Sequence, residues 1–145
     1  MILLFGPTGA GKSVQGQMLA VRMGWKWLST GQMLRDSKDP DVIRILKSGE
    51  LVSDELTYEV FDRAIKDAKE KNYPRVIVDG FPRTKNQAEW LAGYLDRIHE
   101  KIELVLVIEV PESEIMRRLA KRARMEDTPE TVARRMSIYR QKMYP

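Results

Sequence analysis

The sequence predicts an α/β domain with three layers, in which helices cover both faces of a parallel sheet. Short apolar runs alternate with helical patterns along the chain, and this alternation is typical of βαβ units. The β-branched residues at 76–78 and the almost continuously apolar run 102–110 are typical of strands buried on both faces of such a sheet. With 145 residues, of which 43% are hydrophobic, the chain is expected to form a single domain over 1–145.

The composition narrows the classes of function. The chain contains no cysteine, which excludes a disulfide framework and a thiolate zinc site and fits a reducing compartment, so we expect a cytoplasmic protein. The first apolar run is too short for a signal peptide or a membrane span, so no membrane partner is expected. The net charge of +4 favours an anionic partner but does not separate nucleotides from nucleic acid. The single histidine, His99, lies in a charged segment and is expected at the surface rather than in a Ser-His-Asp triad.

Strands and helices can be placed in order along the chain. The expected strands are 2–5, 25–28, 75–79 and 102–110. The first helix ends near Gly24, the next begins at Ser53, a third begins at about Glu112, and the last begins with Thr128 as N-cap and Pro129 at the first helical position. The apolar residues at helical spacing that are expected to face the core are Leu56, Val60, Phe61, Ala64, Ile65, Ala68, Ile115, Met116, Leu119, Ala123, Val132, Met136, Tyr139 and Met143.

The loop after the first strand carries a specific motif. Residues 6–13 read GPTGAGKS, which matches G-x-x-x-x-G-K-[ST] between a strand and a helix. Glycines let the backbone curl so that successive N–H groups point at phosphate oxygens, and the helix N-terminus adds its positive end. Lys12 is then expected to reach the β and γ phosphates, and the Ser13 hydroxyl a magnesium ion. The motif indicates nucleotide binding and leaves the reaction open.

Three further motifs carry a family resemblance. STGQMLR (29–35) follows the second strand, GELVSDEL (49–56) precedes a helix, and DGFPRTKNQ (79–87) follows the third strand. With the glycine loop they resemble the adenylate kinases of the nucleoside monophosphate kinase family, over essentially the whole chain. The resemblance implies a P-loop NTPase-like sheet of order 2-3-1-4 with a small helical nucleoside-monophosphate-binding insertion at 30–59. It also implies reversible, magnesium-dependent transfer of the ATP γ-phosphoryl group to AMP, with ATP, AMP and ADP as partners and no nucleic acid.

The resemblance implies a role for each matching residue. Residues expected to bind ATP are Gly9, Ala10, Gly11, Lys12, Ser13, Val14 and Arg118, the last by stacking on the base. Residues expected to bind AMP are Thr30, Arg35, Glu50, Leu51, Val52, Gly80, Arg83 and Gln87, the last by reading the purine edge. Residues expected to be catalytic are Lys12, Arg83, Arg122, Arg124 and Arg135. Residues expected to hold Mg²⁺ are Ser13 and, through water, Asp79, which lies at the carboxyl end of a strand where such sheets bind ligands.

The arginine-rich stretch near the end of the chain fits this reaction. Phosphoryl transfer needs alignment and positive charge more than covalent chemistry, and arginine supplies a permanent charge with paired donors. Arg118 and Arg122 lie four residues apart and therefore on one face of a helix. The resemblance implies that Glu126 and Asp127 hold the arginines before substrate arrives. The arginines expected in solvent are Arg117, Arg134 and Arg140.

The chain departs from the family pattern in the lid. Only Ala123 separates Arg122 from Arg124, where the family normally carries an insertion that folds over ATP. The lid is therefore expected to be reduced to about 122–127. Closure would then exclude water less completely, so we expect slower transfer or more ATP hydrolysis than in relatives with a lid.

Other departures concern the metal and the last strand. Gln32 stands where the family usually has an acid, and Ser13-Val14 stands where it has Gly-Thr, so the metal geometry is left open. The sequence stops where the family usually proceeds to a last strand and helix, which would leave 102–110 as an edge strand. We expect this edge to be covered by a partner chain, such as a second copy, or the sequence to be a truncation.

Other interpretations stay open. A UMP/CMP kinase or another small-molecule P-loop kinase would carry a similar loop, and a nucleotide-binding module without catalysis would fit the missing lid. For single residues, Arg35 as a surface arginine and Asp79 as the cap of a turn are simpler alternatives. RNA binding is weakly supported, because the aromatic platforms expected on a sheet surface are not evident. Trp25 and Trp27 are expected to lie in the core instead.

Overall fold

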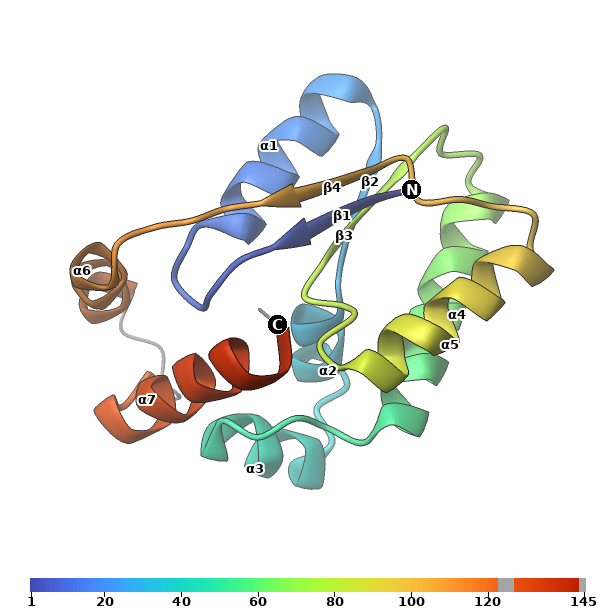
Figure 1. Ribbon diagram of the computed structural model, residues 1–145. Helices are drawn as coiled ribbons and strands as arrows, with labels where there is room; N and C mark the ends of the chain where they lie inside the picture. Colours follow the sequence, from blue (N-terminus) through green and yellow to red (C-terminus); the bar gives the residue numbers. More distant parts are fainter. Residues whose placement is uncertain (123–126, 144–145) are drawn as a thin grey trace.

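The computed structural model describes residues 1–122 and 127–143. The sequence-based expectations for Ala123, Arg124 and Glu126 fall outside these residues. The elements, in chain order, are β1 (Ile2–Phe5), α1 (Lys12–Met23), β2 (Lys26–Ser29), α2 (Thr30–Asp36), α3 (Pro40–Ser48), α4 (Asp54–Glu70), β3 (Val76–Asp79), α5 (Lys85–Arg97), β4 (Leu104–Val107), α6 (Glu112–Arg122), α7 (Pro129–Ile138) and the short π-helix η1 (Tyr139–Met143) (Figure 1).

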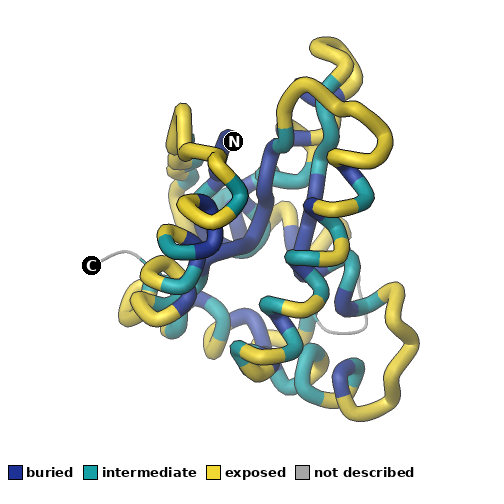
Figure 2. The backbone as a smooth tube through the Cα atoms, turned by 90° about the vertical axis from the view of Figure 1, so that its right-hand side faces the viewer, coloured by how far each residue is buried: buried dark blue, intermediate teal, exposed yellow. Residues whose placement is uncertain are grey.

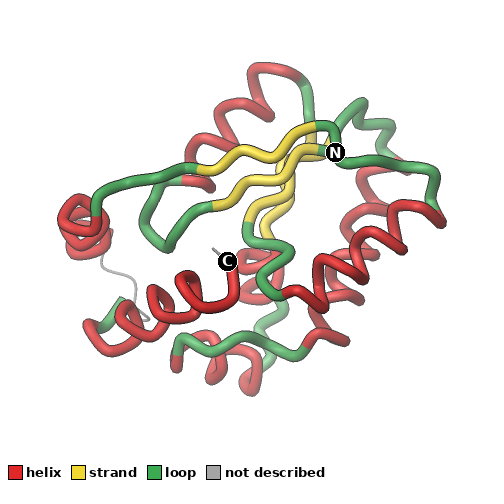
Figure 3. Tube along the Cα trace, in the orientation of Figure 1, coloured by secondary structure: helices red, strands yellow, loops and turns green. Residues whose placement is uncertain are grey.

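The four strands form one parallel sheet in the order β2-β3-β1-β4, which confirms the expected order. In the register of the central strand, Ile2 of β1 lies opposite Ile77 of β3 and Leu104 of β4. Parallel neighbours must be joined by connections that cross a face of the sheet, and here helices make these connections. Figure 3 shows the strands side by side with helices around them.

Helices cover both faces of the sheet, which confirms the three layers. Side chains alternate between the faces along a strand. Ile2 and Leu4 of β1 pack with Ala20 of α1 on one face, whereas Leu3 packs with Phe61 of α4 on the other. The cluster on the second face is completed by Met1, Leu28, Ile65, Val78, Phe81, Leu91, Tyr94 and Leu95. Figure 2 shows that buried residues follow the strands and the inner sides of the helices.

The predicted helix ends are confirmed. Helix α1 is followed by Gly24, whose φ of 68° lies in the left-handed region. Ser53 and Thr128 each accept a backbone N–H of the first turn that follows, and Pro129 is the first residue of α7. Within residues 1–122 and 127–143, no helix has the length and apolar character needed to cross a bilayer.

The prediction that the last strand is buried on both faces was wrong. β4 covers only Leu104–Val107 of the expected 102–110, and Leu104, Val105 and Val107 are 47%, 48% and 54% exposed. Among the described strands β4 lies at one edge of the sheet, as the family resemblance implied, so it has a strand neighbour on one side only. An apolar run therefore identified a strand here but not its burial.

Two predictions of helix faces also need correction. Met116 of α6 is 45% exposed, whereas Ile115 and Leu119 of the same helix are buried. Tyr139 and Met143 are half-buried beside a cleft rather than in the core, because the chain leaves α7 in the wider π-helical turn of η1. The expected core positions Phe61, Ile65, Ala68, Val132 and Met136 are buried.

The chain between β2 and β3 forms a small helical unit of its own. Helices α2 and α3 and the start of α4 enclose a cluster in which Leu34, Val42 and Val52 are buried. This cluster lies away from the sheet and places α3 beneath α7 in the view of Figure 1. The unit therefore forms a wall opposite the carboxyl ends of the strands.

Candidate active site

The glycine loop closes around the side chain of the lysine that follows it. The loop turns through Gly9 and Gly11, whose φ angles of 79° and 97° lie in the region that favours glycine. Nζ of Lys12 donates to the carbonyls of Gly6 and Pro7, at 2.8 Å each. No side chain caps the N-terminus of α1, so its first N–H groups face the loop as donors for an anion.

Lys12 lies in an environment that disfavours its charge. Burial lowers the pKa of Lys12 from 10.5 to about 8; Asp79 opposes this shift, whereas Arg83 and Arg122 add to it. Two guanidinium groups from separate parts of the chain thus act on one ammonium group. An anion bound beside Lys12 would relieve this repulsion, which is the arrangement expected of a phosphate site.

Two oxygen donors meet at the rim of the sheet. Ser13 in the first turn of α1 donates from Oγ to Oδ2 of Asp79 at 2.6 Å, and Asp79 is 3% exposed at the end of β3. They meet because β1 and β3 are parallel neighbours, whose carboxyl ends lie at one edge. No group of three or more acidic or histidine residues that could hold a metal occurs in the described part of the chain. The pair fits a Mg²⁺ ion that takes its other ligands from phosphates and water, as Mg²⁺ commonly does.

On the opposite side of the cleft, four expected residues form one hydrogen-bonded group. The carbonyl of Gly80 accepts from Thr30 Oγ1 at 2.9 Å and from Arg83 Nε at 2.7 Å. Gln87 Oε1 accepts from the backbone N–H of Arg83 at 2.7 Å, and its Nε2 donates to Asp54 at 2.7 Å. Gln87 is 2% exposed, so its amide is already bonded within the protein. Its role in reading a purine stays a prediction, and a purine would have to share these bonds.

Arg35 and Arg83 reach this side of the cleft from α2 and from the loop before α5. Arg35 Nη2 donates to Gln32 Oε1 at 3.1 Å, and Gln32 Nε2 donates to Asp36 at 2.7 Å. Gln32, which replaces the acid usual in the family, therefore contacts Arg35 through a neutral oxygen. Burial lowers the pKa of Arg83, and this shift is opposed by Asp79 and reinforced by Arg135 and Arg35.

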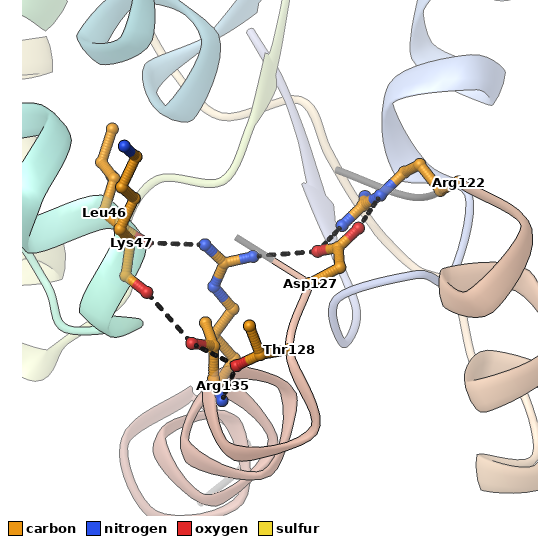
Figure 4. A network of polar contacts seen from close by, with 7 residues as sticks. Leu46, Lys47, Arg122, Asp127, Thr128 and Arg135 are labelled. Carbon is orange, nitrogen blue, oxygen red and sulfur yellow. Dashed lines mark hydrogen bonds and ion pairs between the residues drawn. The ribbon is translucent and has the colours of Figure 1, made fainter. Parts of the chain in front are cut away.

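Asp127 holds two further arginines, as the resemblance implied. Arg122 donates to both Asp127 carboxylate oxygens, at 2.7 and 2.6 Å, and Nη1 of Arg135 lies 3.5 Å from Oδ1 (Figure 4). The Asp127 side chain is only 2% exposed, whereas the side chains of Arg122 and Arg135 are 31% and 20% exposed, so the carboxylate is shielded from water mainly by its two partners. Arg124 and Glu126 lie outside the described residues, and their roles stay predictions.

Arg118 lies over the glycine loop. Its Nη1 donates to the carbonyl of Ala10 at 3.0 Å, and its Nε donates to Glu114 at 2.7 Å. The arginines expected in solvent have side chains that are 56%, 52% and 59% exposed and pair with acids at the surface, which confirms that expectation for Arg117, Arg134 and Arg140.

A cleft of about 540 Å³ joins these groups. The expected site residues that line it are Gly9, Ala10, Gly11, Lys12, Ser13, Val14, Arg35, Glu50, Leu51, Asp79, Gly80, Arg83, Arg118, Arg122 and Arg135. The other three described ones, Thr30, Val52 and Gln87, line a recess of about 20 Å³ that also borders on Gly80 and Arg83. The structure thus brings most of the expected donor and acceptor residues to one cleft, and their individual roles remain proposals.

Several lining residues were not predicted from the sequence. Leu46 and Gly49 line the cleft from the end of α3, and Tyr139 and Met143 line it from η1. Helical spacing did single out Tyr139 and Met143, but as core residues. Nothing in the sequence around Leu46 indicates that its backbone would face a helix from the far end of the chain.

Comparison with known proteins gives the family. The sequence model of the family "Adenylate kinase" matches residues 4–145. An adenylate kinase of Thermus thermophilus is 40% identical over an alignment of 154 positions, which covers 99% of this chain and 79% of that protein. The adenylate kinases of Prochlorococcus marinus NATL2A and Mycolicibacterium paratuberculosis K-10 are each 35% identical over 150 residues, covering 99% of this chain and 80% and 82% of those proteins. With a family match over nearly its whole length and relatives at this level of identity, the chain belongs to the adenylate kinase family.

Proposed function

We propose that this chain catalyses the reversible transfer of the γ-phosphoryl group of ATP to AMP, giving two ADP. The observation that carries the proposal is the convergence of Lys12 with arginines from separate elements on one cleft beside the glycine loop. Such a concentration of positive charge is suited to two nucleotides whose phosphates face each other, because the charges would offset the repulsion between them.

The donor and the acceptor take opposite halves of the cleft in this proposal. The donor phosphates lie in the loop formed by Gly9, Ala10, Gly11, Lys12, Ser13 and Val14, and Arg118 stacks on the donor base. The acceptor lies against Thr30, Arg35, Glu50, Leu51, Val52, Gly80, Arg83 and Gln87. The hydrogen bond from Arg118 to Ala10 supports the first placement, and the group around the Gly80 carbonyl supports the second.

The reaction asks for alignment and charge rather than a protein nucleophile. An oxygen of the acceptor phosphate forms a bond to the γ-phosphorus, and the bond from that phosphorus to the bridging oxygen of the donor breaks. Lys12, Arg83, Arg122, Arg124 and Arg135 stabilise the negative charge on the oxygens of the transferred group. Asp127 keeps Arg122 and Arg135 in place before the substrates arrive, which its two ion pairs support.

Mg²⁺ is proposed as the cofactor, held by Ser13 and, through water, by Asp79. When bound, it would neutralise part of the phosphate charge and help to orient the donor. The 2.6 Å contact between the Ser13 hydroxyl and the Asp79 carboxylate supports this assignment, since it places two oxygen ligands together at the loop.

The same proposal divides the chain into a core with two smaller parts. Residues 30–59 form the insertion that binds the monophosphate, and the lid is reduced to about 122–127. The separate apolar cluster of Leu34, Val42 and Val52 supports the first boundary. Absence of cysteine from the sequence supports a reducing, cytoplasmic location.

A coupled assay of ADP formation from ATP and AMP tests the function, and the variant Arg83→Ala tests the site. We expect Arg83→Ala to lower kcat/KM by about 10²–10³-fold, the range typical of losing one donor to a developing oxyanion. Arg44→Ala is the matched control, because the Arg44 side chain is 78% exposed and pairs only at the surface with Asp41. Circular dichroism would check that both variants fold.

The alternatives are separate outcomes of this assay. Full activity in Arg83→Ala would overturn the site assignment. A preference for UMP or CMP in a panel of monophosphates would indicate another kinase of the same class. Tight ATP binding with no ADP formed from ATP and AMP would indicate a nucleotide-binding module without catalysis.

We also propose that the segment 102–110, in which β4 covers Leu104–Val107, pairs with the same segment of a second copy. An antiparallel pair centred on Val105 would place Lys101 of one copy opposite Glu109 of the other and would cover the exposed apolar side chains of β4. Sedimentation equilibrium should detect a dimer that Val105→Lys disrupts. A wild-type protein that stays monomeric at high concentration would contradict the pairing.

A further inference from the structure

The end of helix α3 is held by side chains from α7. The last carbonyls of a helix have no N–H partner within it and need donors from elsewhere. The carbonyl of Leu46 accepts from Arg135 Nη2 at 2.8 Å, and that of Lys47 accepts from Thr131 Oγ1 at 3.0 Å (Figure 4). Thr131 lies 84 residues along the chain from Lys47, so this contact joins distant segments.

The contact made by Thr131 is partly buried and close. Thr131 is 6% exposed, and its backbone N–H is held by the N-cap hydroxyl of Thr128 at 3.2 Å, which fixes the first turn of α7. On the other side stands Gly49, whose φ is 80°. A Cβ added to Gly49 would lie 3.0 Å from Thr131 Cγ2 and 3.1 Å from the Thr131 carbonyl oxygen. The turn after α3 and the first turn of α7 are therefore packed so closely that a side chain at Gly49 would crowd Thr131.

A second link between the two helices is weak by comparison. Arg134 pairs with Glu50 at 2.9 Å, but the two side chains are 52% and 59% exposed. Exposed ion pairs of this kind contribute little, because water screens them and both side chains lose freedom. The position of the turn depends mainly on Thr131 and Arg135.

This contact acts on the proposed acceptor site. Gly49, Glu50 and Leu51 line the cleft directly after the turn, and Arg135 enters the same cleft from α7. If the Thr131 bond were lost, the Lys47 carbonyl would lack its side-chain donor and the turn could move away from α7. Residues 49–51 and Arg135 would then no longer be held in a fixed position relative to each other.

We propose that Thr131 is a positioning residue for the acceptor nucleotide: its hydroxyl holds the turn at 47–51 against α7, so that the acceptor backbone and Arg135 face the same phosphate. Thr131 acts through these groups and does not touch the substrate, since it does not line the cleft. The inference rests on the proposed function, because it assigns the 49–51 wall to the acceptor.

The test replaces Thr131 by valine, which keeps the shape and removes the donor, and by serine, which restores the donor. We expect Thr131→Val to raise KM for AMP about five- to tenfold, the effect of losing the hydrogen bond to the Lys47 carbonyl. The variant also removes the acceptor of the Thr128 hydroxyl, but Thr128 is exposed and its hydroxyl can bond to water instead. KM for ATP should change less than about twofold, because the donor half of the cleft does not depend on this turn. Thr131→Ser should return KM for AMP to near the wild-type value.

Ser48→Ala is the matched control. Ser48 Oγ donates to the carbonyl of Ile45 at 2.8 Å within α3, so the variant loses a similar bond in the same helix end without touching α7. It should leave both KM values near those of wild type. Thermal stabilisation by AMP alone and by ATP alone provides a readout without turnover, and only the shift caused by AMP should shrink in Thr131→Val.

The outcomes separate this inference from the proposed function. A wild-type protein that forms no ADP from ATP and AMP would overturn the function itself. An active wild type with unchanged KM for AMP in Thr131→Val would overturn the inference alone. Equal rises of both KM values, or failure of serine to restore KM for AMP, would make Thr131 a general packing residue and would also overturn it.

Discussion

Replacing Lys12 by methionine is expected to stabilise the free protein while it removes the transfer activity. Burial lowers the pKa of Lys12 from 10.5 to about 8, and this difference corresponds to about 3 kcal/mol of destabilisation at pH 7. The side chain is half-buried, and methionine would leave the carbonyls of Gly6 and Pro7 without their donor. These two effects reduce the expected gain in unfolding free energy to about 1–2 kcal/mol.

The gain should depend on pH in a defined direction. Because the pKa of Lys12 is lower in the folded state, the unfolded state binds more protons between about pH 8 and 10.5. The penalty is therefore fully present below about pH 8 and disappears as pH rises through this window. Lys12→Met lacks this proton linkage, so its advantage over wild type should shrink from pH 7 to pH 10.

Urea unfolding at pH 7 and at pH 10 measures both effects. At pH 7 the variant should also melt about 3–7 °C above wild type, from the usual relation between stability and Tm for a domain of this size. Lys85→Met is the control for loss of one positive charge, because Lys85 is 87% exposed. A variant less stable than wild type at pH 7, or an advantage that does not change with pH, would refute the reasoning.

The remaining predictions concern the arginines and the lid. Asp127→Asn should lower the unfolding free energy by about 2–3 kcal/mol, because it removes a buried charge that pairs with Arg122 and Arg135. Chemical denaturation measures this loss. An unchanged unfolding free energy would show that these ion pairs do not stabilise the fold. The loss in Asp127→Asn should be smaller when ATP and AMP are both present, because phosphates would then pair with the arginines. ATP hydrolysis without AMP should be a measurable fraction of the transfer rate, given the short segment between Arg122 and Arg124; negligible hydrolysis beside fast transfer would contradict the expected leak.

The local elements could be predicted from the sequence because their signals are local. The glycine pattern at 6–13 requires a strand before it and a helix after it, and both are present as β1 and α1. Thr128 and Pro129 mark the start of α7, because a capping hydroxyl and a proline suit only the first turn of a helix. The order of the strands followed from the family resemblance, which the motifs carry, and was confirmed.

Several features of the site were decided by tertiary structure alone. The sequence did not indicate the partners of the Gln87 amide, which bonds to Arg83 and to Asp54, a residue 33 positions away, and its role in reading a purine stays a prediction. Tyr139 and Met143 have the helical spacing of core residues but line the cleft, because no period in the sequence records which surface lies opposite.

The sequence by itself determined the four strand segments, the starts of α4, α6 and α7, and a glycine loop between the first strand and the first helix. Only the tertiary structure decided that the side chains of β4 are largely exposed, that Tyr139 and Met143 line the cleft, and that Thr131 reaches the carbonyl of Lys47. The physical reason is the range of the interactions. Backbone preferences, caps and periodicity act within a few residues, whereas burial and ion pairing depend on which distant segments the fold brings into contact.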